Sequence, residues 1–106
     1  MYETVAIRKI YKTTILDMDT TVQLPIGAIP LRVDQQHDVP TIWWLVNPEA
    51  KFQKTRIITV GTGESFDVAG FTYVGTAVCN DGRLIWHLFM ETSVKSMLER
   101  HSQQRS

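Results

Sequence analysis

The chain has 106 residues, the length of one ordinary domain with a single hydrophobic core. Eleven Lys and Arg balance eleven Asp and Glu, so the net charge offers no general attraction for nucleic acid or an anionic membrane. The lone Cys79 excludes an internal disulfide, and the lack of a signal peptide or of an apolar run near ~20 residues predicts a cytoplasmic protein.

The first forty residues predict three strands that lie at sheet edges or are partly exposed. β-branched residues favour a strand over 5–15, and a short alternating segment at 21–24 is stopped by Pro25. Because proline lacks the N–H that a central ladder needs, segment 21–24 is expected at a sheet edge. In segment 29–33, Pro30 indicates either an edge or the first residue of a strand. The polar run 34–38 predicts an exposed loop.

The segment 41–46 is apolar on both faces of an extended chain, which is typical of a central strand covered on two sides. Pro48 indicates a turn, after which the chain is expected to reverse into a strand at 52–60. Gly61 ends this strand. In the loop after it, Phe66 and Val68 are expected to tuck against the sheet.

The segment 71–90 predicts the central hairpin of the fold, with Trp86 in the core. Asn80, Asp81 and Gly82 are turn residues, since all three tolerate the positive φ angles of a tight hairpin loop. Both faces of the second strand carry large apolar groups, so it needs cover on two sides.

After Met90 the apolar period changes from two to that of a helix. Val94, Met97 and Leu98 form a stripe that predicts an amphipathic helix over about 92–103. The predicted fold is therefore mainly β: a small antiparallel β-sandwich or barrel-like sheet of about six or seven strands with one C-terminal α-helix. The expected division is a β-rich domain at 1–91 and a helix with a frayed tail at 92–106. The apolar stripe either mediates a homodimer or lies on its own sheet.

No group of residues predicts catalysis, a cofactor or a metal. The Gly-Thr pairs at 61–62 and 75–76 lack the Lys and the following helix of a phosphate loop. The histidines have no partner at metal-ligand spacing, and Cys79 and Ser65 have no base beside them. His87 is interpreted as a core residue whose ring nitrogens are satisfied. The chain is therefore predicted not to be an enzyme.

Short groups of aromatic, turn and glycine residues are spread along the chain: Ile10-Tyr11-Lys12, Pro25-x-Gly27-Ala28, Trp43-x-Leu45-Val46-Asn47-Pro48, Gly61-Thr62-Gly63, Tyr73-x-Gly75-Thr76 and Trp86-His87. Through these residues the chain resembles a family of short uncharacterised proteins carried mainly by bacteriophages and prophages, a domain of unknown function. The resemblance covers residues 7–90, while this chain differs in carrying Trp44 beside Trp43 and in extending past Met90. The resemblance implies a phage origin and a life in the cytoplasm of an infected bacterium, and it implies no activity.

Three hypotheses of function remain, and all three are binding functions. The first is an accessory or counter-defence factor that binds a host protein or protein complex. The second is a protein that sequesters a nucleotide or another small ligand, for which Arg56, Thr62 and Thr76 are the candidate ligand-binding residues. The third is a structural virion component that associates with itself through sheet edges or the tail. Basic residues near Tyr11 and Phe52 are interpreted as a solvated sheet face, since general nucleic-acid binding is not expected at neutral net charge.

Overall fold

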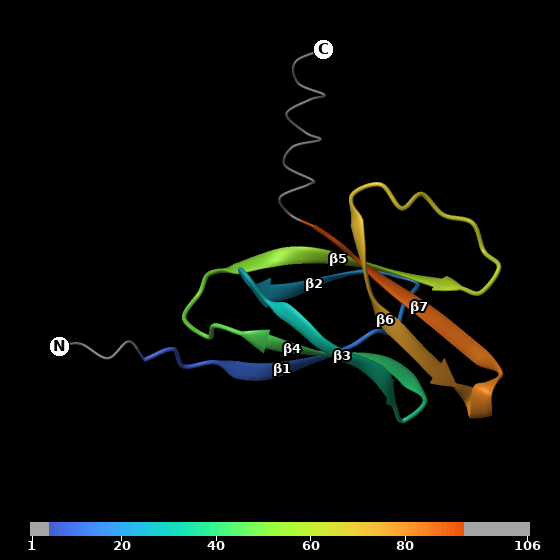
Figure 1. Ribbon diagram of the computed structural model, residues 1–106, viewed down its shortest axis with the longest axis horizontal. Helices are drawn as coiled ribbons and strands as arrows, with labels where there is room; N and C mark the ends of the chain where they lie inside the picture. The colour runs from blue at the N-terminus through green and yellow to red at the C-terminus, as the bar shows by residue number, and fades with distance from the viewer. Residues whose placement is uncertain (1–4, 93–106) are drawn as a thin grey trace, which may run out of the picture.

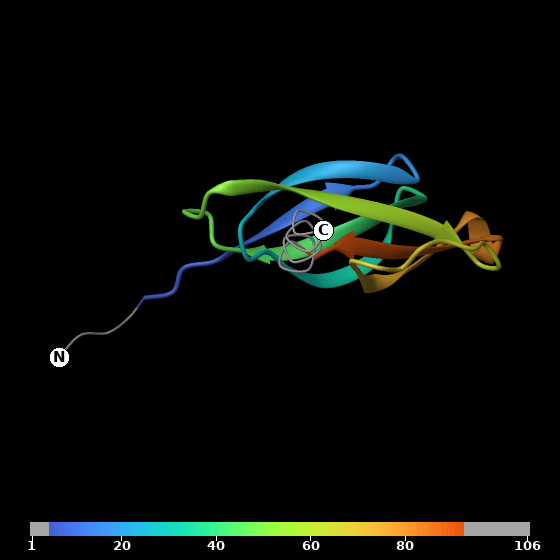
Figure 2. The ribbon, with the colours of Figure 1, turned by 90° about the horizontal axis from the view of Figure 1, so that it is seen from above.

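The computed structural model describes residues 5–92, which form a β-sandwich of two antiparallel sheets (Figures 1 and 2). The three-stranded sheet has the order β1-β4-β3 and the four-stranded sheet the order β2-β5-β7-β6. The strands are β1 (Lys9–Thr14), β2 (Asp19–Pro25), β3 (Ile29–Gln36), β4 (Val39–Val46), β5 (Phe52–Gly61), β6 (Phe71–Cys79) and β7 (Leu84–Glu91).

The predicted β-sandwich is present, but the predicted fold class is wrong because it included a C-terminal α-helix. Residues 5–92 contain only strands and one 3-10 turn, η1 (Asn80–Gly82), and Thr92 lies in no helix. The rest of the predicted helix, with Val94, Met97 and Leu98, lies outside the described residues. Within the described range there is no helix long and apolar enough to cross a membrane.

The core lies between the two sheets and follows from the alternation of side chains along each strand. Trp44 is fully buried on β4, and its indole Nε1 donates a hydrogen bond to the Thr13 hydroxyl of β1 (3.0 Å). This bond satisfies the one polar group of the largest core side chain. The other buried members of the core cluster are Ile15, Leu24, Ile42, Val46, Ile57 and Leu88.

The strand at 71–79 and the strand at 84–91 form the predicted hairpin, and its turn residues are confirmed. Asn80, Asp81 and Gly82 have φ angles of 51°, 53° and 86°. Only β7 is central, however, because β6 lies at the edge of the four-stranded sheet. Near its start β6 has a bulge before Gly75, where it crosses β3 closely.

The sequence predicted that the polar run 34–38 is a loop, and this prediction is wrong. Asp34 and Gln36 continue β3 with their side chains on the outer face, and β3 pairs with β4 up to Gln36 opposite Val39. His37 and Asp38 alone make the turn, with φ angles of 53° and 66°. Positive φ at both positions is what a two-residue hairpin needs to match the twist of its strands. Pairing with β4 therefore keeps these polar residues in a strand, although their composition is typical of a loop.

The turn predicted at Pro48 is present, since the Ala50 N–H donates to the Asn47 carbonyl oxygen (3.1 Å). The strands on either side of it do not pair with each other. Both edges of β4 are already occupied, by β1 and β3, so the chain crosses to the other sheet and β5 pairs with β2 and β7. The turn thus joins the two layers rather than closing a hairpin.

Candidate functional site

A chain of hydrogen-bonded side chains lies on the outer face of the four-stranded sheet, around His87 of β7. The Thr62 hydroxyl lies 2.8 Å from its Nε2, and the Thr76 hydroxyl 3.0 Å from its Nδ1. The Tyr73 hydroxyl in turn lies 2.5 Å from the Thr76 oxygen. Register explains the arrangement, because Thr76 on β6 is directly opposite His87 while Thr62 follows the end of β5.

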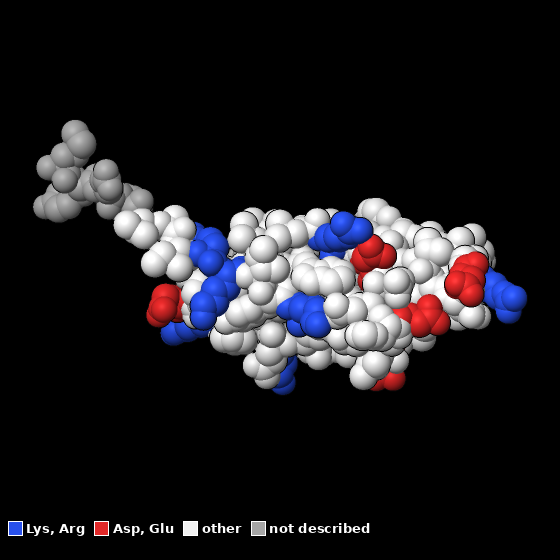
Figure 3. Space-filling view, turned by 90° about the horizontal axis from the view of Figure 1, so that it is seen from below, with Lys and Arg blue, Asp and Glu red and all other residues white. Residues whose placement is uncertain are grey.

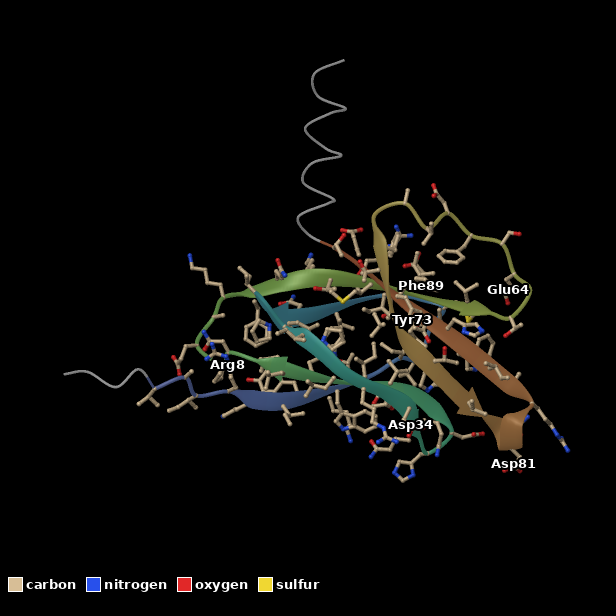
Figure 4. All side chains as sticks on the ribbon, viewed as in Figure 1. Arg8, Asp34, Glu64, Tyr73, Asp81 and Phe89 are labelled. Atoms are coloured by element: carbon tan, nitrogen blue, oxygen red, sulfur yellow. The ribbon has the colours of Figure 1, made fainter. Side chains whose placement is uncertain are left out.

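Three aromatic rings lie beside this polar chain and shield one side of it. Phe89, two residues along β7 from His87, has its ring centroid 4.6 Å from that of Phe66 and 5.5 Å from that of Tyr73. Figure 4 shows Tyr73 and Phe89 next to each other in the middle of the sheet. The prediction that Phe66 tucks against the sheet is confirmed, whereas Val68 from the same loop is 53% exposed. The hydrogen-bonded side chains around His87 therefore lie next to a cluster of three aromatic rings.

Arg56 points to the same face but is engaged elsewhere. Its guanidinium holds the Asp19 carboxylate through two bonds of 2.9 and 2.7 Å and lies 5.6 Å from the Phe71 ring centroid. The hydrogen bonds from Arg56 lower the pKa of Asp19, and the same bonds raise the pKa of Arg56. The β5–β7 register places Arg56 four residues along the sheet from His87, about 13 Å at ~3.3 Å per residue.

Of the three predicted ligand-binding residues, the structure brings Thr62 and Thr76 together and leaves Arg56 apart. His87, which joins the two threonines, was interpreted as a core residue. It is half-buried on the outer face. The alternation of β7 contained the missing information: once Leu88 faces the core, its neighbours His87 and Phe89 must face outward.

A cleft of about 240 Å³ opens between the ends of the two sheets. Thr59 of β5 lies in its lining, is 6% exposed, and its hydroxyl oxygen has no hydrogen-bond partner among the described residues. The acidic side chains of the cleft are Asp17 and Asp38. The remaining lining residues, most of them apolar, are Ile15, Leu16, Met18, Val39, Pro40 and Trp86.

Trp86 also lines a second hollow, of about 330 Å³, beside the end of β5. Here the Glu64 carboxylate lies over Gly61, so close that a Cβ added at Gly61 would meet its Oε1 at 2.6 Å. Trp86 was predicted as a core residue. It packs against the core cluster but is half-buried, and it forms a wall shared by both hollows.

The outer face of the three-stranded sheet carries a row of apolar side chains that solvent reaches. Ile10 of β1 and Ile29 of β3 both pair with Leu45 of β4, and they are 62% and 55% exposed. The next row along the sheet places Trp43 between two cationic residues, Lys12 and Arg32. With Leu31 of β3 these apolar side chains make up a surface termed the apolar face, defined as Ile10, Ile29, Leu31, Trp43 and Leu45.

Cys79, the lone thiol of the chain, is buried at the end of β6. Burial, with smaller contributions from Asp38 and Asp34, raises the pKa of the Cys79 thiol, so this sulfur stays protonated at neutral pH. Residues 5–92 contain no group of three His, Cys, Asp or Glu side chains able to hold a metal ion.

Fold and surfaces together define a small antiparallel β-sandwich whose distinctive groups lie on its outer faces and in a cleft at one end. The family model described as "Domain of unknown function (DUF7352)" matches residues 6–98, so the chain belongs to this family. The match confirms the resemblance to a domain of unknown function and runs past Met90, where that resemblance ended. Among curated proteins and among solved structures, no significant match to the chain was found.

Proposed function

We propose that this protein is a binding protein, not an enzyme, and that it docks on another protein through the apolar face of its three-stranded sheet. The exposed row formed by Ile10, Leu45 and Ile29 carries the proposal. Contiguous apolar surface of this kind, with polar residues around it, is typical of interaction sites. Docking removes these side chains from water and gains ~25 cal/mol for each Å² of apolar area buried.

The residues around the apolar face favour a partner with acidic groups at its rim. Lys12 is exposed, and its ammonium is held by the Gln36 side chain at 2.6 Å, a neutral partner that leaves its charge uncompensated. Arg32 contributes less positive charge, because it pairs with Asp34 (2.6 Å). A carboxylate opposite Lys12 would supply the missing counter-charge and fix the orientation of the partner.

The partner that fits this proposal is a host protein or protein complex. The resemblance to phage-carried proteins supports a phage-encoded accessory or counter-defence factor that acts in the cytoplasm of the infected cell. A small protein that blocks a host complex needs a rigid docking surface rather than a catalytic group. Strand β4 supplies this rigidity, because its backbone is paired on both sides and its inward side chains are buried.

The experiment is affinity purification from host cells with matched variants of the full chain. Ile10→Lys combined with Ile29→Lys places two charges on the apolar face, and Thr21→Lys places one on the exposed outer face of the other sheet. We expect a stoichiometric partner with the wild type and with Thr21→Lys, and its loss with the double variant. Retention of the partner by a folded double variant would contradict the proposal.

A second candidate function, small-ligand sequestration, is favoured by the convergence of Thr62 and Thr76 on His87. The hydroxyls and ring nitrogens there already bond one another, so a ligand would have to replace bonds rather than make new ones. Thermal-shift screening with nucleotides and cyclic nucleotides tests this function. A stabilisation that Thr62→Val and Thr76→Val both abolish would establish it over protein docking. We expect no stabilisation.

A further inference from the structure

Residues 5–8, which precede β1, are exposed and form an arm beside the sandwich. The last pair of β1 with β4 is Lys9 opposite Val46, and residues 5–8 run on beyond it, away from both sheets (Figure 1). On this arm Val5 is 75% and Ile7 is 66% exposed. Arg8 donates to the carbonyl oxygen of Ile7 (3.0 Å) and forms no ion pair within the described chain.

The cleft beside Trp86 is complementary to such an arm in size and in polarity. Its volume of about 240 Å³ is below the ~300–1,000 Å³ of most small-molecule sites, so it suits one or two apolar side chains. Leu16 and Met18 in its lining are 77% and 44% exposed. Asp17 and Asp38 give it negative charge, and neither forms an ion pair among the described residues.

The arm and the cleft lie apart on the molecule. Positive side chains are more frequent toward the arm, and negative side chains toward the cleft. Figure 3 shows Lys and Arg gathered toward the N-terminal end and most of the Asp and Glu toward the other end. Figure 4 places Arg8 where β1 begins, with Asp34 and Asp81 toward the opposite end. On the face shown in Figure 3 the two signs of charge are therefore unevenly divided, although each end also carries the opposite sign.

We propose that the protein associates with itself head to tail, with the arm of one copy seated in the cleft of the next. Ile7 enters the apolar part of the cleft against Trp86, and Arg8 reaches the carboxylate of Asp17 at its rim. The unpartnered hydroxyl of Thr59 lies in the same lining, where an extended arm brings backbone N–H and C=O groups.

Because arm and cleft are different surfaces, each added copy leaves one arm and one cleft free. Such a heterologous contact builds open chains rather than a closed dimer, unless its rotation happens to close a ring. This inference goes beyond the proposed docking of a partner protein, and it uses none of the residues of the apolar face.

The test is sedimentation velocity of the full chain over a range of concentrations. We expect the wild type to grow beyond two copies of its 12.1 kDa chain as concentration rises. Ile7→Asp and Leu16→Asp should each weaken association at least tenfold, since burying an aliphatic side chain of this size contributes that much or more. Both side chains are well exposed in one copy, so neither substitution disturbs its core.

A mixture of the two variants gives the sharpest outcome. Ile7→Asp keeps its cleft and Leu16→Asp keeps its arm, so the equimolar mixture should form a pair of two chains and grow no further. Ile29→Asp, on the apolar face, is the matched control and should assemble like the wild type. A wild type that stays monomeric at millimolar concentration, or stops at a dimer, would overturn the proposal, as would variants that assemble normally.

Charge reversal identifies the polar half of the contact. Arg8→Glu should weaken association and reverse its salt dependence, because it places a carboxylate opposite Asp17 and salt screens the new repulsion. Combining Arg8→Glu with Asp17→Lys restores opposite charges and should recover assembly. Failure of the double variant to recover any association, with both single variants weakened, would show that Asp17 is not the partner of Arg8.

Discussion

A close approach of the two sheets makes a sharp test of the fold at Gly75. A Cβ built on this glycine would lie 2.6 Å from Cγ2 and 2.7 Å from Cβ of Val33 on β3. The second distance decides the outcome, because Cβ does not move when the valine side chain rotates. In Gly75→Ala the new methyl group can be accommodated only if β3 and β6 move apart.

The expected cost is about 2 kcal/mol of unfolding free energy. Overpacking a well-packed core costs ~1–3 kcal/mol, and a contact between two Cβ atoms belongs near the top of that range. The backbone at Gly75 does not have the positive φ of a left-handed residue. Alanine therefore also gains about 0.4–1 kcal/mol by restricting the unfolded chain, which offsets part of the loss. For a domain of this size the net effect lowers the Tm by roughly 8–16 °C.

Urea unfolding followed by tryptophan fluorescence measures this cost, with an unchanged m-value as the sign that only stability has changed. Val33→Ala provides the control. Alone it loses up to about 1.5 kcal/mol for two half-buried methyl groups. It removes the Cγ2 contact but keeps Cβ of residue 33, so Gly75→Ala should still be destabilising in its background, by up to about 1 kcal/mol less than in the wild type. A Gly75→Ala protein within about 0.5 kcal/mol of the wild type, or strict additivity of the two substitutions, would refute the argument.

Burial and charge give two further predictions. Trp44→Ala should lower the free energy of unfolding by about 3–5 kcal/mol, because Trp44 is fully buried. Trp43→Ala should lower it by less than about 2 kcal/mol, because Trp43 is half-buried on the outer face. Similar losses for the two variants in urea unfolding would contradict the assignment of faces. The bonds to Arg56 lower the pKa of Asp19, so this carboxylate stabilises the fold above its unfolded pKa of about 3.9, and the contribution is lost as pH falls through the folded value. Asp19→Asn should therefore lower stability at pH 7 by less than about 1 kcal/mol, the scale of a solvent-screened pair. In acid titrations of stability the difference should shrink as the carboxylate becomes protonated in both states, and a difference independent of pH would assign it to packing.

The two adjacent tryptophans, Trp43 and Trp44, show that the pairing of strands decides which side chain is buried and which lies on the surface. Both lie on a strand that is apolar on both faces, so the sequence gives no reason to prefer one for the core. In the sandwich, Trp44 faces the second sheet and finds the Thr13 hydroxyl, while Trp43 faces outward between Lys12 and Arg32. The outward one contributes to the proposed docking face.

Local patterns in the sequence are enough to place most of the strands and turns. These are local properties: β-branched residues favour extended backbone, Pro25 and Pro30 confine their strands to edges, and the residues at 80–82 accept positive φ. The sequence also placed β4 and β7 inside their sheets, because both strands are apolar on both faces. The expected cover on two sides is not found for β4, whose outward Trp43 and Leu45 lie on a face that solvent reaches. The turn at His37 and Asp38 was not predicted from the sequence. The polar composition of 34–38 indicated a loop, but residues up to Gln36 pair with β4.

Which strands share a sheet follows from contacts between residues distant in the chain, and every candidate site depends on this arrangement. The sheet order places Thr62 and Thr76 on either side of His87, and it separates Arg56 from them by two rows of side chains. It also brings the turns that carry Asp17 and Asp38 to one cleft, far along the chain from Trp86. Such pairings join residues distant in sequence, and their free energy comes from burial between layers, which no local pattern of residues encodes.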